Sequence, residues 1–187
     1  MRLLVRFCMT TGVRLMNALR LTWAQVDYEA GVIAFRTKSK RPGGERHVIP
    51  ITREIRILLA NERGKHPIYV YTYVCRRNRG KRRKGQRYPF SKNDWRKDWK
   101  AALSAAGIKD FRFHDLRHTA ATRLLRATGN LAVVQRVLGH SSPTMTLRYA
   151  HVEVDDMRAA MEAAARHTAA TQATETDERI NETKDVV

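Results

Sequence analysis

The stretch "HDLRHTAATRLLRATGNLAVVQRVLGHSSPTMTLRYAH", residues 114–151, decides which fold this chain adopts. Apolar residues recur at helical spacing over 114–128 and 131–138, and "TGN" and Gly139 end the two runs. The following "SSPT" is typical of the start of another helix, because proline is tolerated in a first turn. The stretch therefore predicts consecutive helices that carry histidine, arginine and tyrosine side chains.

The charge of the chain is strongly positive and unevenly distributed. The formal net charge of the 187 residues is +18, and residues 153–187 contain nine acidic and four basic side chains. Residues 1–152 therefore carry a formal +23. So basic a body attracts polyanions, because each neutralised phosphate releases counterions. Nucleic acid is the expected partner, and a ribosome-associated or membrane-surface protein is the alternative.

Length, hydropathy and cysteine usage limit the class of protein. The chain is long enough for one domain with a hydrophobic core. It contains no run of 18 or more apolar residues, so we expect no transmembrane span. Cys8 and Cys75 have no metal-type spacing and indicate reduced thiols in a cytoplasmic protein.

The remaining segments predict further helices and one hairpin. "MRLLVRFCMTTG" indicates a helix that ends at Gly12, and "VRLMNALRLTW" indicates a second, short helix. "GVIAF" and "RHVIP" are β-rich runs around a Lys/Gly-rich turn, which predicts a hairpin. Helices are expected over 53–63 and 91–106, and "IYVYTYV" is a strand or a buried extended segment. The fold class is therefore α+β, mostly α-helical, with a small antiparallel sheet or hairpin on one side.

The segment "CRRNRGKRRKGQRYPF", residues 75–90, is the most basic part of the chain. Its glycines and its lack of periodicity predict a loop or flexible ribbon. Eight cations without an interleaved acid repel one another, which favours a polyanion partner over a solvated face. The predicted non-specific nucleic-acid contacts are Arg76, Arg77, Arg79, Lys81, Arg82, Arg83, Lys84 and Arg87.

Three side chains near residue 114 share one helix face. His114 and Arg117 are three residues apart, and His118 is one turn after His114, which raises a zinc site as an alternative. Asp115 stands where the metalloprotease motif has a glutamate, and Arg117 would place a cation beside the metal. No metal is therefore expected, and His118 is interpreted as a core histidine or as a support for other site residues.

A different chemistry suits the set better. Breaking a phosphodiester without metal needs a nucleophile, cations for the non-bridging oxygens and an acid for the leaving oxygen. Arg14 and Arg117 suit the second task, because a guanidinium binds two phosphate oxygens and stays charged. Tyr149 can be the nucleophile, and Lys38 or Lys40 of the hairpin can be the acid.

The motifs "TGVR", "TKSK…RHVIPI", "HDLRHTAAT", "LGHSS" and "TLRYAH" occur here in the order found in one family. In these motifs the chain resembles the tyrosine recombinases, the phage-integrase family, over nearly its whole length. The resemblance implies a tyrosine-recombinase catalytic domain over residues 1–167. Residues 168–187 are polar and are expected to form a disordered tail.

The resemblance also implies a role for each motif residue. Arg14 and Arg117 would clamp the scissile phosphate, and His114 would assist proton movement at the nucleophile. His140 matches the position that hydrogen-bonds a non-bridging oxygen, and Tyr149 matches the nucleophile.

Two lysines of the hairpin match the general-acid position of the family. Lys38 matches the general acid that protonates the 5′-hydroxyl leaving group, and Lys40 is the competing assignment.

The implied reaction is a transesterification on double-stranded DNA. Tyr149 would form a 3′-phosphotyrosyl bond and free a 5′-hydroxyl, with no ATP, divalent metal or other cofactor. Two strand exchanges imply four protomers on two duplexes. The amphipathic segment 152–167 would dock onto a neighbouring protomer, and packing onto its own domain is the alternative.

The chain departs from the family pattern in two places. Asn17 stands where many members have an acidic residue that supports the first arginine. We also expect the chain to lack the N-terminal domain with which family members complete a clamp around DNA. The second departure raises the alternative of a truncated, non-cleaving DNA-binding protein that modulates a full-length recombinase. A type IB topoisomerase-like enzyme and a basic RNA-binding protein are further alternatives.

Overall fold

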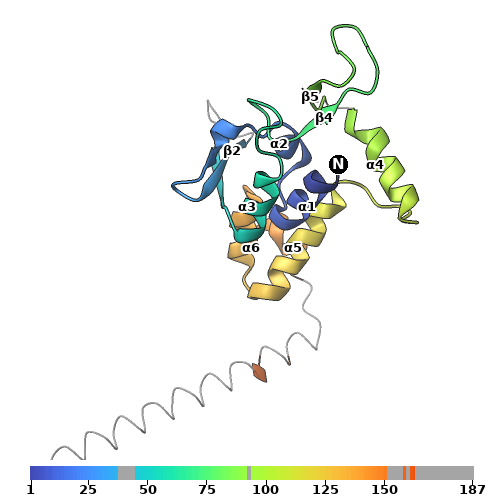
Figure 1. Ribbon diagram of the computed structural model, residues 1–187. Coiled ribbons are helices and arrows are strands. Elements are labelled where there is room, and N and C mark those ends of the chain that lie inside the picture. The colour runs from blue at the N-terminus through green and yellow to red at the C-terminus, as the bar shows by residue number, and fades with distance from the viewer. Residues whose placement is uncertain (38–44, 92–93, 151–157, 159–160, 163–187) are drawn as a thin grey trace, which may run out of the picture. The chain divides into compact units, whose positions relative to one another are not determined.

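A computed structural model describes residues 1–37, 45–91, 94–150, 158 and 161–162 (Figure 1). The chain divides into two units, Met1–Tyr149 and Ala150–Val187, and the fold below is that of the first. Lys38 and Lys40 lie outside the described residues, as do most of the predicted helix 152–167 and the whole predicted tail 168–187.

Helices and short strands alternate along the first unit. Their order is α1 (Arg2–Thr11), α2 (Leu15–Leu19), the 3₁₀ helix η1 (Trp23–Gln25), β1 (Val26–Asp27), β2 (Val32–Thr37), β3 (Glu45–Pro50), α3 (Arg53–Ala60), β4 (Thr72–Val74), β5 (Arg87–Pro89), α4 (Asp94–Ala105), α5 (Asp115–Thr128), α6 (Leu131–Leu138) and α7 (Thr144–Leu147). The predicted α+β class is confirmed. None of the described helices has the length and apolar character needed to cross a membrane.

The predicted hairpin forms β2 and β3 of a three-stranded antiparallel sheet, in the order β1-β2-β3, so β2 is the central strand. Ile33 pairs with Ile49 and Phe35 with His47. These four side chains are buried, whereas Val48 between them on β3 is 40% exposed. The alternation follows from the two-residue period of a strand, so one face of the sheet lies on the core.

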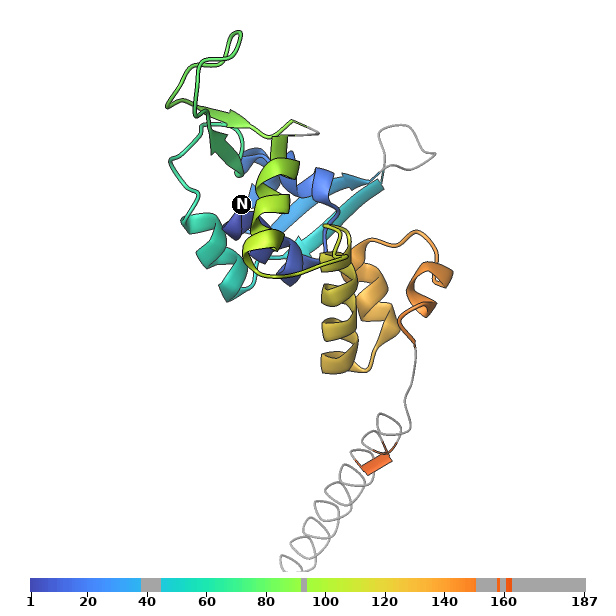
Figure 2. The ribbon, with the colours of Figure 1, turned by 90° about the vertical axis from the view of Figure 1, so that its right-hand side faces the viewer.

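The core lies where this sheet meets α1 and α5, which pack against each other (Figures 1 and 2). Phe7 of α1, Phe35 of β2 and Leu116 of α5 belong to one buried cluster. A smaller cluster joins α5 to α6 through Ala121, and Tyr149 packs against it. Apolar burial therefore holds α5 in the main core and α6 against α5, at about 1.5–3 kcal/mol per large side chain.

The first helix ends at Gly12, as predicted, and the glycine is required for two reasons. Its φ is 63°, in the left-handed region, and a Cβ there would lie 2.4 Å from Cδ2 of Leu138. Only a residue without a side chain both ends α1 and lets α6 approach.

The second helix is shorter than "VRLMNALRLTW" predicts. Arg14 is extended (φ −64°, ψ 140°), and after Leu19 the chain leaves the helix. The Leu21 carbonyl then accepts the Val70 N–H at 2.9 Å, and the Ile68 carbonyl accepts the Trp23 N–H at 2.9 Å. This pairing with a distant segment overrides the helical pattern, and it confirms "IYVYTYV" as extended.

Candidate active site

Arg117 is held by the ends of two helices. Its Nη1 donates to the Gly12 carbonyl at 2.7 Å and its Nη2 to the Leu138 carbonyl at 2.9 Å. Both carbonyls lie at helix C-termini, where the helix dipole is negative and carbonyls lack intrahelical partners. The side chain is only 5% exposed. Burial, and then the charge of Arg14, lower the pKa of Arg117 to about 10, so the guanidinium stays charged at neutral pH.

Arg14 stands at the N-terminus of α2, directly after the loop that Arg117 contacts. Its positive charge contributes to lowering the pKa of Arg117 and of His140, so Arg14 lies within electrostatic reach of both. Neither arginine pairs with a carboxylate within the described part of the chain. The two cations therefore form an uncompensated positive region that favours an anionic ligand.

His140 follows Gly139, which ends α6 in the left-handed conformation at φ 64°. Its Nδ1 lies 2.8 Å from Oγ1 of Thr146, which is buried. Burial, followed by the charges of Arg117 and Arg14, lowers the pKa of His140 to about 4. The imidazole is therefore neutral at pH 7 and oriented by Thr146.

Tyr149 lies two residues after α7 and contacts two histidines. Its hydroxyl is 2.8 Å from Nδ1 of His118. Its ring stacks on His140, with centroids 6.3 Å apart and planes 6° apart. Burial raises the pKa of the Tyr149 hydroxyl, while the charges of Arg117 and Arg148 oppose this.

His114 and His118 meet on α5, with their rings edge to face at 5.1 Å. Burial, and then the charges of His118 and Arg117, lower the pKa of His114. The described residues include no group of three or more His, Cys, Asp or Glu side chains that could hold a metal ion. Of the two interpretations of His118, the structure favours the support of other site residues over a core position, because its ring is half-buried and contacts Tyr149.

His47 supports the site and was not singled out from the sequence. Its Nε2 lies 3.1 Å from the Arg136 carbonyl and 3.0 Å from the Val137 carbonyl at the end of α6. A Cβ on Gly139 would lie 2.9 Å from the His47 ring. His47 thus ties α6 to the sheet directly before His140. The signal in the sequence was a polar residue on the buried face of "RHVIP".

The structure therefore brings five predicted side chains into one region. They come from the start of α2, from α5, from the end of α6 and from the end of α7, and they are Arg14, His114, Arg117, His140 and Tyr149. Their roles in catalysis stay predictions.

The basic segment 76–87 connects β4 to β5, and Figures 1 and 2 show this green hairpin projecting beyond α4. It is a loop, which is one of the two predicted alternatives, and its backbone is hydrogen-bonded. The Cys75 N–H donates to the Gln86 carbonyl at 2.8 Å, and Arg79 and Arg82 exchange two backbone hydrogen bonds of 3.0 Å. Six of the eight predicted cations are exposed: Arg76, Arg77, Arg79, Lys81, Arg83 and Lys84.

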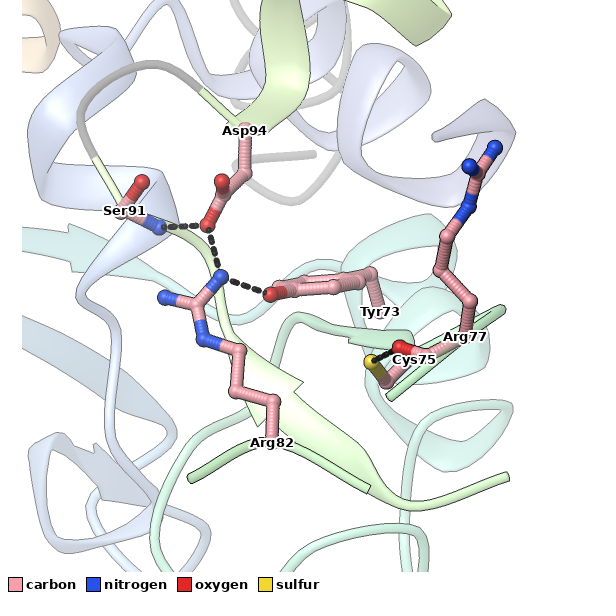
Figure 3. A network of polar contacts seen from close by, with 6 residues as sticks. All are labelled: Tyr73, Cys75, Arg77, Arg82, Ser91 and Asp94. Atoms are coloured by element: carbon pink, nitrogen blue, oxygen red, sulfur yellow. Dashed lines mark hydrogen bonds and ion pairs between the residues drawn. The ribbon is translucent and has the colours of Figure 1, made fainter. Parts of the chain in front are cut away.

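The other two, Arg82 and Arg87, are half-buried and have protein partners. Nη1 of Arg82 donates to the Tyr73 hydroxyl and to Oδ2 of Asp94, the latter at 3.1 Å (Figure 3). Its guanidinium also lies over the rings of Tyr73 and Tyr88. Arg82 thereby ties the hairpin to the first residue of α4 and presents the six exposed cations on an ordered support.

Comparison with known proteins agrees with this architecture. The sequence model of the phage integrase family matches residues 1–156. The integrase of Salmonella phage P22 is 33% identical over 148 residues, which are 79% of this chain and 38% of the phage protein. The integrase of Haemophilus phage HP1 is 30% identical over 163 residues, 85% and 39% of the two chains. The chain thus spans about two fifths of the length of these relatives.

Solved structures agree as well. The catalytic domain of bacteriophage HP1 integrase is 28% identical with a TM-score of 0.56, over 86% of this chain and 79% of that one. The Tn1549 transposon integrase, solved in complex with transposon right end DNA, is 25% identical with a TM-score of 0.62, over 86% and 57% of the two chains.

Proposed function

Because the chain belongs to the phage integrase family, we propose that it is the catalytic domain of a site-specific DNA recombinase that cuts and rejoins DNA through Tyr149. The main support for this proposal is the geometry around Tyr149, whose hydroxyl is within hydrogen-bond distance of His118 and whose ring stacks on His140. Arg14 and Arg117 belong to the same region, and no described carboxylate pairs with either of them. A phosphodiester supplies the missing negative charge.

Arg117 is suited to hold that phosphate. Two of its five N–H groups are used by the Gly12 and Leu138 carbonyls, which fix the plane of the guanidinium. The remaining donors are available for phosphate oxygens, and they need no reorientation as charge develops in the transition state. Arg14 would add a second cation, and the neutral His140 would donate a hydrogen bond to a non-bridging oxygen.

The proposed reaction has two symmetrical halves. The Tyr149 oxygen attacks the phosphorus, forms a 3′-phosphotyrosyl bond and displaces a 5′-hydroxyl. A 5′-hydroxyl of another strand then displaces Tyr149. Lys38 is the proposed acid for the leaving oxygen, with Lys40 as the alternative, and the chemistry uses no metal or cofactor.

Double-stranded DNA is the proposed partner. The Tn1549 integrase was solved with transposon DNA, and the recombinase XerH, 25% identical with a TM-score of 0.57, was solved bound to its difH substrate. The exposed cations of the β4–β5 hairpin would contact DNA backbone, because such contacts position a protein without reading sequence. We further propose a homotetramer on two duplexes in the cytoplasm, with segment 152–167 docked on a neighbouring protomer.

A covalent trap tests this function. The substrate would be a nicked duplex that carries the attachment site, which is the DNA sequence that the recombinase is proposed to cut. It would be incubated in EDTA with wild type and with Tyr149→Phe. We expect a protein–DNA adduct that survives denaturation with wild type alone. Retained binding without an adduct in wild type would contradict the proposal and would favour the non-cleaving alternative, which the comparisons do not support.

The same trap separates the two lysines. Lys38→Ala is expected to slow cleavage strongly at a normal 5′-oxygen and weakly at a 5′-sulfur, because sulfur leaves without an acid. The same pattern with Lys40→Ala would assign the acid to Lys40 instead.

A further inference from the structure

The hydroxyl of Tyr149 has a hydrogen-bond partner that the resemblance does not assign. Within the part of the chain that the structure describes, this partner is Nδ1 of His118, at 2.8 Å. His114, to which the resemblance gives proton movement at the nucleophile, contacts the ring of His118 instead. The histidine one helical turn further along α5 is therefore the one that touches the attacking atom.

The contact is fixed by packing on two sides. His118 follows Arg117 on α5, and Arg117 is locked by the carbonyls of Gly12 and Leu138, so this turn of the helix has a set orientation. The rings of His118 and Tyr149 lie 5.6 Å apart, and Tyr149 also stacks on His140. The arrangement matches the geometry of an activated nucleophile, in which an oriented base lies within hydrogen-bond reach.

A base is useful at this position. Burial raises the pKa of the Tyr149 hydroxyl, so at neutral pH the attacking oxygen carries a proton. A neutral imidazole that is protonated at Nε2 has a lone pair at Nδ1 and accepts that proton. Positioned bases of this kind accelerate proton transfer by about 10²- to 10⁴-fold.

We propose that His118, and not His114, takes the phenolic proton of Tyr149 during attack and returns it during rejoining. The inference rests on the proposed function. In the forward step the Tyr149 oxygen bonds to phosphorus and its proton moves to Nδ1 of His118. The bond from phosphorus to O5′ breaks, and O5′ keeps the electron pair and takes a proton from the hairpin lysine. Rejoining reverses each of these movements.

The main test compares two isosteric variants. In asparagine a side-chain oxygen occupies nearly the position of imidazole Nδ1, so His118→Asn keeps a hydrogen-bond acceptor for Tyr149 but cannot take up its proton. His114→Asn is the comparison variant on the same turn of the chain: loss of a site residue lowers its rate as well, but its pH profile should stay that of wild type. Single-turnover adduct formation on the nicked attachment-site duplex would be measured from pH 6 to pH 9, and binding of that duplex would be measured in parallel.

We expect His118→Asn to bind DNA as wild type does and to form the adduct about 10²- to 10⁴-fold more slowly. Its rate should rise tenfold per pH unit, because hydroxide must then remove the proton. Arg117, Arg148 and His140 lie near the pair and are present in both variants, so they do not account for a difference between them. A wild-type rate and pH profile in His118→Asn would overturn the proposal, as would a tenfold rise in rate per pH unit in His114→Asn.

Two further measurements separate proton transfer from positioning. Replacing Tyr149 with a fluorinated tyrosine makes the phenol more acidic, so it should reduce the factor by which His118→Asn slows adduct formation. If His118 only positions Tyr149, that factor stays unchanged. Nitrogen NMR of histidine-labelled wild type should find Nδ1 of His118 unprotonated, and a proton on Nδ1 would overturn the proposal even if the variant fails to fold. No adduct in wild type would instead contradict the proposed function itself.

Discussion

At the scale of single residues, the site depends on atoms that are placed by helix ends. The Gly12 carbonyl holds Arg117 because α1 ends there, and α1 can end there because Gly12 adopts a positive φ against Leu138. Stability and the orientation of the phosphate-binding arginine are therefore coupled at one glycine.

Gly12→Ala tests this coupling, and Gly129→Ala is its matched control. Both glycines end helices with φ near 60°, but no atom lies within 4 Å of a Cβ on Gly129. The control should lower the free energy of unfolding by about 1 kcal/mol for the left-handed backbone alone. Gly12→Ala should cost about 1–3 kcal/mol more, because Leu138 must move. Equal losses in urea unfolding would show that the close approach of α6 is unimportant.

His140, whose ring stacks on Tyr149, should make the stability of the fold depend on pH. The pKa of His140 is about 4 in the fold and 6.5 as a reference for the unfolded chain, so the unfolded state binds more protons between these values. The free energy of unfolding should therefore fall as the pH is lowered from 6.5 to 4. His140→Gln should flatten this part of the curve, measured by urea unfolding at each pH. Parallel curves for the two proteins would mean that His140 is not buried neutral.

At the scale of elements, some boundaries were predictable and others were not. The glycines after 128 and 138 fixed the ends of α5 and α6, because a left-handed residue stops a helix whatever surrounds it. The short α2 and the ordered β4–β5 hairpin were not predictable. Both depend on partners far away in the sequence, Ile68 and Val70 in the first case and Asp94 in the second.

The hairpin gives a prediction with an internal control. Replacing the exposed Lys81, Arg83 and Lys84 with glutamine should reduce the slope of log K against log salt by about 0.9 for each DNA phosphate that is no longer neutralised. Arg82→Gln should leave the slope near that of wild type, because Asp94 already compensates its charge. An unchanged slope in the triple variant would make the hairpin a solvated surface, and an equal drop in the control would assign Arg82 to DNA.

At the scale of the whole molecule, the site joins residues from positions 14 to 149. The sequence predicts which residue types take part, because the motifs and their order are specific as a set. It does not predict their contacts, since these depend on how α5, α6 and α7 pack on one another and on α1. For this reason the sequence does not predict that His118 contacts Tyr149, although His114 and His118 stand one helical turn apart.

The central claim is that Tyr149 becomes covalently attached to DNA. The most direct measurement is mass spectrometry of the tryptic peptides of wild type trapped on its nicked attachment-site duplex in EDTA. We expect a nucleotide linked through its 3′-phosphate on the peptide that begins at Tyr149, after cleavage at Arg148. A nucleotide on a peptide that contains another tyrosine, such as Tyr73 or Tyr88, or DNA cut without any protein linkage, would contradict it.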